Sequence, residues 1–133
     1  MNEYEALYAE ICDQTEAGSL CWKQIPRHAN SEIILNVEEV LRQYEATFHR
    51  HGQAYKLLLL DKRHKEIDFL FRKFELREPE LHVIHEGELL TSLNQLHIDP
   101  SRLGALLGVV EPQSNLTRGL LGKPQASAAT RQA

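Results

Sequence analysis

The sequence predicts an α+β domain with an N-terminal helix, a small antiparallel sheet of three to four strands, and C-terminal helices. Three observations lead to this fold class. Apolar residues recur at helical spacing after Asn2, segments between residues 54 and 74 have the apolar patterns of strands, and Asp99-Pro100 opens another helical pattern. The length of 133 residues fits one domain, which we place at residues 1–110, followed by a flexible tail over 111–133.

The N-terminal segment is typical of a capped helix over residues 3–16. Asn2 is a capping residue type with Glu5 at the third helical position, and Gly18 is a natural stop. Residues 20–25 then predict a short strand that Pro26 ends. Cys12 and Cys21 fall in these two elements, and we expect both to be small buried thiols rather than a disulfide framework.

The stretch from residue 36 to residue 50 has two interpretations. Asn36 followed by Glu39 is a capping pattern, and the apolar spacing over 37–48 favours a helix that Gly52 ends. The alternative is a strand over 42–50 that turns at His51-Gly52, because residues 44, 46 and 48 also alternate. We favour the helix, because the helical spacing extends over a longer stretch of sequence than the strand alternation does.

The middle of the chain contains the clearest strand patterns, over residues 54–60 and 66–74. Residues 57–60 are apolar on both faces, which indicates a central strand, and the polar residues 62–66 are expected to form a hairpin loop. The expected buried positions of this antiparallel sheet, with the N-terminal helix packed on it, are Leu58, Leu60, Ile67, Phe69 and Phe71.

The last third of the chain predicts one strand and two helices. Residues 81–85 are a third candidate strand, and leucine spacing predicts a helix from Glu86 onward. Asp99 and Pro100 have the residue types of a helix cap and a first helical position, and Gly108 is expected to end that helix. The tail lacks large apolar residues near its end, so it is expected to stay flexible.

Composition narrows the function classes. The formal net charge of −4 disfavours a general attraction to nucleic acid or anionic membranes. The N-terminus has no signal-peptide pattern, and the longest apolar run, residues 57–60, is too short to span a bilayer, so we expect a cytoplasmic protein. The seven histidines show no zinc-finger or metalloprotease spacing, and we expect them to be surface residues without a metal or other cofactor.

A set of carboxylates resembles the core of the PD-(D/E)xK nuclease family. Glu66-Ile67-Asp68 opens a strand, and residues 81–88 lead from another strand into a helix. The resemblance implies that Asp68 and Glu86 hold a divalent metal beside a phosphate, with Glu88 where the family usually has lysine. Alternatively, Asp68 faces solvent on an alternating strand, and Glu86 and Glu88 lie in the first turn of a helix.

Residues 100–121 resemble a helix-turn-helix. Residues 103–109 end in Leu-Gly-Val, as first helices of this motif often do, and Leu116-Thr117-Arg118 would begin the recognition helix. The intervening turn contains Pro112 and is about two residues too long for the motif. The alternative is a closing helix packed on the sheet, followed by the tail.

We therefore expect a small non-enzymatic interaction or regulatory protein of bacterial style. It would bind another protein, or a second copy in a homodimer, through a sheet edge, exposed helices or the tail. The nuclease and the DNA-binding protein remain the alternatives. We expect no membrane partner and no nucleic-acid partner in the favoured interpretation.

Overall fold

The computed structural model describes residues 2–94 and 96–121. Within them the fold is α+β, with a six-stranded antiparallel sheet where the sequence predicted three to four strands. The elements in chain order are α1 (Glu3–Glu16), β1 (Lys23–Ile25), the 3-10 helix η1 (Val37–Glu39), β2 (Val40–Arg50), β3 (Gln53–Ile67), β4 (Lys73–Arg77), β5 (Glu80–His85), β6 (Glu88–Leu93), α2 (Pro100–Gln113) and α3 (Asn115–Leu121). The strand order is β1-β2-β3-β5-β6, and β4 pairs only with the far half of β3.

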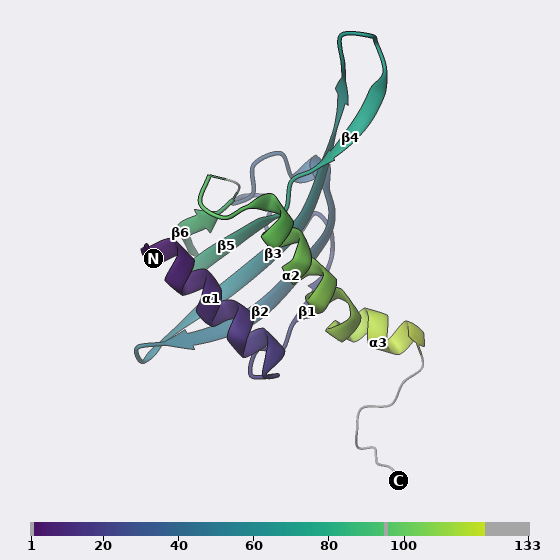
Figure 1. Cartoon of the computed structure of the whole chain (residues 1–133). Helices are drawn as coiled ribbons and strands as arrows, with labels where there is room; N and C mark the ends of the chain where they lie inside the picture. Colours follow the sequence, from purple (N-terminus) through teal and green to yellow (C-terminus); the bar gives the residue numbers. More distant parts are fainter. Residues whose placement is uncertain (1, 95, 122–133) are drawn as a thin grey trace.

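Helices α1 and α2 cover one face of the sheet (Figure 1). As predicted, α1 begins at an Asn2 cap, whose side-chain oxygen accepts from the Glu5 amide at 2.8 Å. Gly18, at φ 81°, follows its last turn in the left-handed conformation that suits glycine. The main core lies between these helices and the sheet, and its fully buried side chains include Ile11, Tyr44, Phe48, Leu57, Leu59, Leu81, Leu93, Leu103 and Leu107.

The opposite face of the sheet is covered by the segment between β1 and β2. A smaller core forms there from Ile34, Val40, Leu58, Leu60 and Ile84. The predicted burial of Leu58 and Leu60 is therefore confirmed, and so is the central place of this two-faced apolar strand.

The buried amide of Gln43 holds this covering segment in place. Its nitrogen donates to the carbonyls of Arg27 (3.2 Å) and Ala29 (2.9 Å), and its oxygen accepts from Asn30 Nδ2 at 2.7 Å. Because Gln43 belongs to β2, these bonds connect an irregular loop directly to the sheet. They also satisfy the buried amide, which would destabilise the fold if it had no hydrogen-bond partner.

Two of the expected helices are strands. The favoured helix over 36–50 is wrong apart from the single turn of η1, because β2 pairs along nearly its whole length with β3. The helix expected from Glu86 is also wrong, because β6 pairs with β5. The dipeptides His51-Gly52 and Glu86-Gly87 take left-handed φ at both residues, as tight two-residue hairpin turns require.

The polar residues 62–66 do not form the expected loop. They continue β3, which runs to Ile67, and the chain turns at residues 68–71 before β4 returns. We call residues 63–77 the arm, since this two-stranded hairpin projects beyond the body of the protein (Figure 1). The predicted burial of Ile67, Phe69 and Phe71 is wrong, because all three lie on the arm and are exposed.

The C-terminal helices differ from the sequence prediction at their ends. Helix α2 begins at Asp99-Pro100 as predicted, but it passes Gly108 and ends after Gln113, with Pro112 in its last turn. Helix α3 then occupies part of the stretch that was expected to be a flexible tail, and residues 122–133 lie outside the described part. Cys12 is half-buried and Cys21 is exposed outside β1, so the expectation of two buried thiols fails for Cys21.

Candidate interaction site: the projecting arm

The arm has the most exposed aromatic side chains of the described residues. Phe69 and Phe71 are both 87% exposed at its tip. Leu70 lies between them, and the further apolar side chains Ile67, Phe74 and Leu76 are also exposed. Single apolar residues on a surface are ordinary, but six on one fifteen-residue hairpin form a concentrated apolar surface of the kind that marks an interaction site.

Asp68 organises the turn at the tip. Its amide donates to the Arg72 carbonyl at 3.0 Å, and its carboxylate accepts from the amides of Leu70 (2.8 Å) and Arg72 (2.9 Å) and from Arg72 Nε (2.8 Å). Hydrogen bonds to the charged carboxylate, led by that from the Arg72 amide, lower the pKa of Asp68. The tip is therefore a defined turn whose apolar side chains project from an ordered backbone.

Phe71 occupies an unfavourable backbone conformation in this turn. Its φ is 60°, in the left-handed region that a bulky side chain rarely adopts and that turns of this kind usually fill with glycine or asparagine. The same side chain gains almost no burial within the protein. Strain at an exposed position points to a role outside the fold of the single chain.

The base of the arm is anchored on the helix side by Asp61. The Asp61 side chain is only 4% exposed. It accepts from Arg63 through both oxygens, at 3.1 and 3.2 Å, and from Arg77 Nε at 3.4 Å, and Arg42 lies 3.9 Å away. Because Arg63 and Arg77 come from the two strands of the arm and Arg42 from β2, one carboxylate connects the arm to the body.

The opposite face of the base carries a second polar network. Lys62 Nζ donates to the Leu35 carbonyl at 3.0 Å and to Glu80 at 3.3 Å. Glu80 lies 3.1 Å from His82 Nε2, and the Ser92 hydroxyl lies 2.7 Å from His82 Nδ1. Burial raises the pKa of Glu80, but the contacts with His82 and Lys62 outweigh it, so the pKa is lowered overall.

This Ser92–His82–Glu80 chain has the residue types of a nucleophile, a base and an orienting acid. However, none of the four main cavities in the described part of the chain opens onto any of the three. Of the three side chains only His82 is buried, and its hydrogen-bond partners Glu80 and Ser92 are partly exposed. We assign this set of mutually bound polar groups to anchoring the arm.

His64 is held between two carboxylates farther along the arm. Its Nδ1 lies 2.6 Å from Glu78 Oε1 and its Nε2 lies 2.6 Å from Glu66 Oε2. Both contacts are best made by a ring that carries a proton on each nitrogen, and the hydrogen bonds with Glu66 and Glu78 raise the pKa of His64. Because His64 and Glu66 lie on β3 and Glu78 follows β4, these contacts cross-link the two sides of the arm.

The structure separates the carboxylates of the nuclease resemblance. Glu86 lies in the β5–β6 turn and Glu88 at the start of β6, where β5 pairs with the Lys56 end of β3. From Lys56 to Asp68 the chain advances twelve residues along β3, which corresponds to about 40 Å. Within the described residues, no group of three or more His, Cys, Asp or Glu side chains has an arrangement suited to a metal ion.

The stretch that resembles a helix-turn-helix contains two helices, α2 and α3, with Ser114 alone between them. Helix α3 has no buried residue, whereas α2 buries four apolar residues against the sheet, namely Leu103, Leu106, Leu107 and Val110. Arg118, the expected recognition residue, donates from Nε to the Gln113 carbonyl at 3.1 Å. This short α3 and its one-residue connection do not have the geometry of a groove-reading helix pair.

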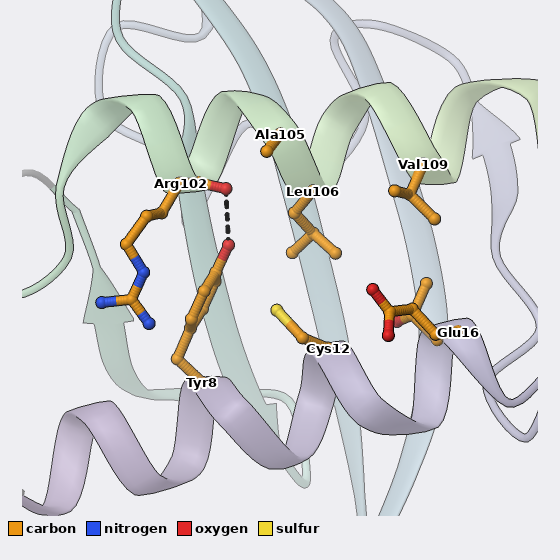
Figure 2. A pocket seen from close by; sticks show the side chains of 8 residues that line it. Tyr8, Cys12, Glu16, Arg102, Ala105, Leu106 and Val109 are labelled. Carbon is orange, nitrogen blue, oxygen red and sulfur yellow. Dashed lines mark hydrogen bonds between the residues drawn. The ribbon is translucent and has the colours of Figure 1, made fainter.

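A pocket of about 250 Å³ lies between α1 and α2 (Figure 2). The Tyr8 hydroxyl donates to the Arg102 carbonyl at 2.7 Å, and Arg102 Nη1 donates to Glu5 at 2.7 Å. Burial raises the pKa of the Cys12 thiol, which keeps it protonated and weakly nucleophilic. Tyr8 and Arg102 are thus occupied by contacts within the chain, and the rest of the lining is mainly apolar side chains of α2, with the Glu16 carboxylate at one end.

The fold and the arm together define a class: an α+β sheet protein with a projecting hairpin that carries an exposed apolar tip. No family model, curated protein or solved structure matches the chain in the three comparisons made. One signal for the arm was present in the sequence, since Asp68 is a residue type that favours turns and comes directly before Phe69-Leu70-Phe71.

Proposed function

We propose that this chain is a protein-binding module that contacts its partner through the tip of the arm. The observation that carries the proposal is the full exposure of Phe69 and Phe71 on an ordered turn. Exposed aromatic side chains are the residue type that most often dominates the binding energy of protein interfaces. The body of the domain, by contrast, keeps its aromatic side chains Phe48 and Tyr44 fully buried.

The anchoring of the arm favours tight recognition. The Asp61 cluster, the Lys62–Glu80 pair and the His64 contacts fix both strands at several points between the base and the tip. A binding element that is already ordered loses less conformational freedom on association, so more of the contact energy appears as affinity.

A protein partner fits the apolar tip of the arm better than a nucleic acid does. The arm has a net charge of +2, but its three arginines are paired within the chain, Arg63 and Arg77 with Asp61 and Arg72 with Asp68. The chain as a whole carries −4, which opposes binding to phosphate-rich surfaces. In the described residues, no helix is both long enough and apolar enough to cross a bilayer.

A photo-crosslinking amino acid at position 69, introduced in the producing cell, tests this function. We expect a protein adduct at position 69 and none at position 120, since Leu120 is 85% exposed on α3 and is a matched control outside the arm. The adduct should disappear when Leu70→Ser and Phe71→Gly are added. Equal adducts at the two positions, or flotation of the protein with anionic vesicles through the tip, would contradict the proposal.

A further inference from the structure

The outer edge of the arm has backbone groups that point away from the protein. The Glu78 amide donates to the Lys62 carbonyl at 2.8 Å, and the Asp68 amide donates to the Arg72 carbonyl at 3.0 Å. In an antiparallel pair the bonded positions alternate, so the even-numbered residues of β4 bond to β3. The odd-numbered residues Lys73, Glu75 and Arg77 therefore direct their N–H and C=O groups outward.

This edge is open in the part of the chain that the structure describes. β4 pairs with β3 and with no other described strand, and all five residues of β4 are exposed. The arm stands clear of both helices and of the other strands in Figure 1. An isolated two-stranded ribbon with an open edge is marginal by itself and readily accepts a further strand.

The sequence of β4 is complementary to itself in one antiparallel register. When two copies pair with Phe74 opposite Phe74, Lys73 of each copy lies opposite Glu75 of the other. The two-fold symmetry of the pair repeats this contact, so both directly opposed ionic positions join opposite charges. The two Phe74 side chains meet at a position that does not exchange hydrogen bonds, where strands bring side chains closest together.

The register does not extend into the tip, because Phe71 has the left-handed backbone of the turn, and its counterpart Arg77 binds Asp61 within its own chain. Antiparallel arms place the two bodies at opposite ends of the four-stranded ribbon. Each arm projects beyond its own body (Figure 1), which leaves the β4 edge accessible to a second copy.

The geometry points to a second copy of this chain as the occupant of the β4 edge, through an antiparallel β4–β4 pairing centred on Phe74. This inference rests on the proposed function, because it names one partner of the same arm. The contact is small, since it pairs about five residues on each side, and weak self-association is the expected behaviour.

Charge-swapped variants test the pairing by sedimentation velocity over a range of concentrations. Lys73→Glu places like charges opposite each other twice, and so does Glu75→Lys, so each variant should self-associate about tenfold or more weakly than the wild type. The double variant K73E/E75K should regain wild-type association. Both positions are exposed, but Glu75 also binds Arg63 at 3.4 Å and lies opposite Lys65 on β3. Circular dichroism of the whole protein and hydrogen exchange of the arm amides are therefore measured for each variant to check that the body and the arm stay folded.

A mixture of the two single variants gives the sharpest result. The K73E chain has a carboxylate at both position 73 and position 75, whereas the E75K chain has an ammonium group at both positions. Every opposed ionic pair in the mixed dimer is therefore attractive. We expect the mixture to associate where neither variant alone does.

A wild type that stays monomeric at every concentration, or self-association that is indifferent to these substitutions, would overturn the inference. Either result would leave the crosslink at position 69 free to support a different protein partner, so the two proposals fail separately.

Discussion

Phe71 is the residue whose conformation costs the single chain stability while its side chain serves the proposed function. Its left-handed backbone is disfavoured for a bulky side chain, and its ring is outside the core. The wild-type residue therefore gives the single chain little stability. A partner that covers the ring would supply the compensating interaction.

Replacing Phe71 by glycine and by alanine separates the strain from the side chain. Both variants lose the same exposed ring, but only glycine adopts φ 60° without a Cβ clash. We expect Phe71→Gly to be more stable than Phe71→Ala by about 1 kcal/mol in urea unfolding. Equal stabilities would indicate that the turn relaxes to another conformation in solution.

His64 makes the arm sensitive to pH. Its pKa is raised above the ordinary 6.5 by Glu66 and Glu78, so the protonated ring favours the folded arm. The stabilisation is fully present below pH 6.5 and is lost as the pH rises through the higher folded-state pKa. Hydrogen exchange of the arm amides should therefore accelerate more between about pH 6 and pH 8 than the intrinsic rate does.

His64→Gln is the control for this effect, because an amide keeps hydrogen bonding without titrating in this range. In that variant the additional pH dependence of arm exchange should disappear. A histidine whose ring titrates at or below 6.5 by NMR would contradict the assignment.

Among the elements, β3 shows most clearly what sequence patterns can and cannot predict. Residues 57–60 were correctly assigned to a central buried strand, because burial on both faces needs continuous apolar residues. The polar residues 62–66 predict a loop, because a strand shows alternating apolar and polar side chains only where one of its faces is buried. On the arm neither face is covered by the body, so this signal is absent.

The other errors have similar local causes. Residues 36–50 fit helical spacing over a longer stretch than strand alternation, and only the pairing with β3, a contact between distant segments, makes them the strand β2. The leucines after Glu86 fit a helix, but the tight turn at Glu86-Gly87 joins β5 to β6 instead. By contrast, both capped helix starts, at Asn2 and Asp99, were predictable because a cap depends on residues within one turn.

Asp61 tests whether the arm depends on its anchor. Asp61→Asn keeps the side-chain shape but removes the charge that Arg63, Arg77 and Arg42 surround. The arginines are partly solvated, so we expect a loss of about 1–2 kcal/mol in the free energy of unfolding. Hydrogen exchange should rise most in β4 and in the far half of β3. A uniform rise over the whole sheet would show that Asp61 supports the core rather than the arm.

In the whole molecule, the buried apolar residues fill two cores, one on each face of the sheet. Six exposed apolar residues lie on the arm, and others, such as Leu35, Leu96 and Leu120, are exposed singly or on α3. The arm also carries a net charge of +2, whereas the rest of the chain carries −6. We therefore expect the free energy of unfolding to depend mainly on the body, and we propose that the arm serves recognition.

The free energy of unfolding of a tip variant tests this division most directly. Phe69→Ser and Leu70→Ser combined with Phe71→Gly remove the apolar tip, and Leu107→Ala in the main core is the matched control. In urea titrations at a protein concentration where the wild type is monomeric, we expect the tip variant to lie within about 0.5 kcal/mol of the wild type. Leu107→Ala should lose about 2–5 kcal/mol. A comparable loss in the tip variant would show that these side chains pack into the fold, and would contradict the division between body and arm.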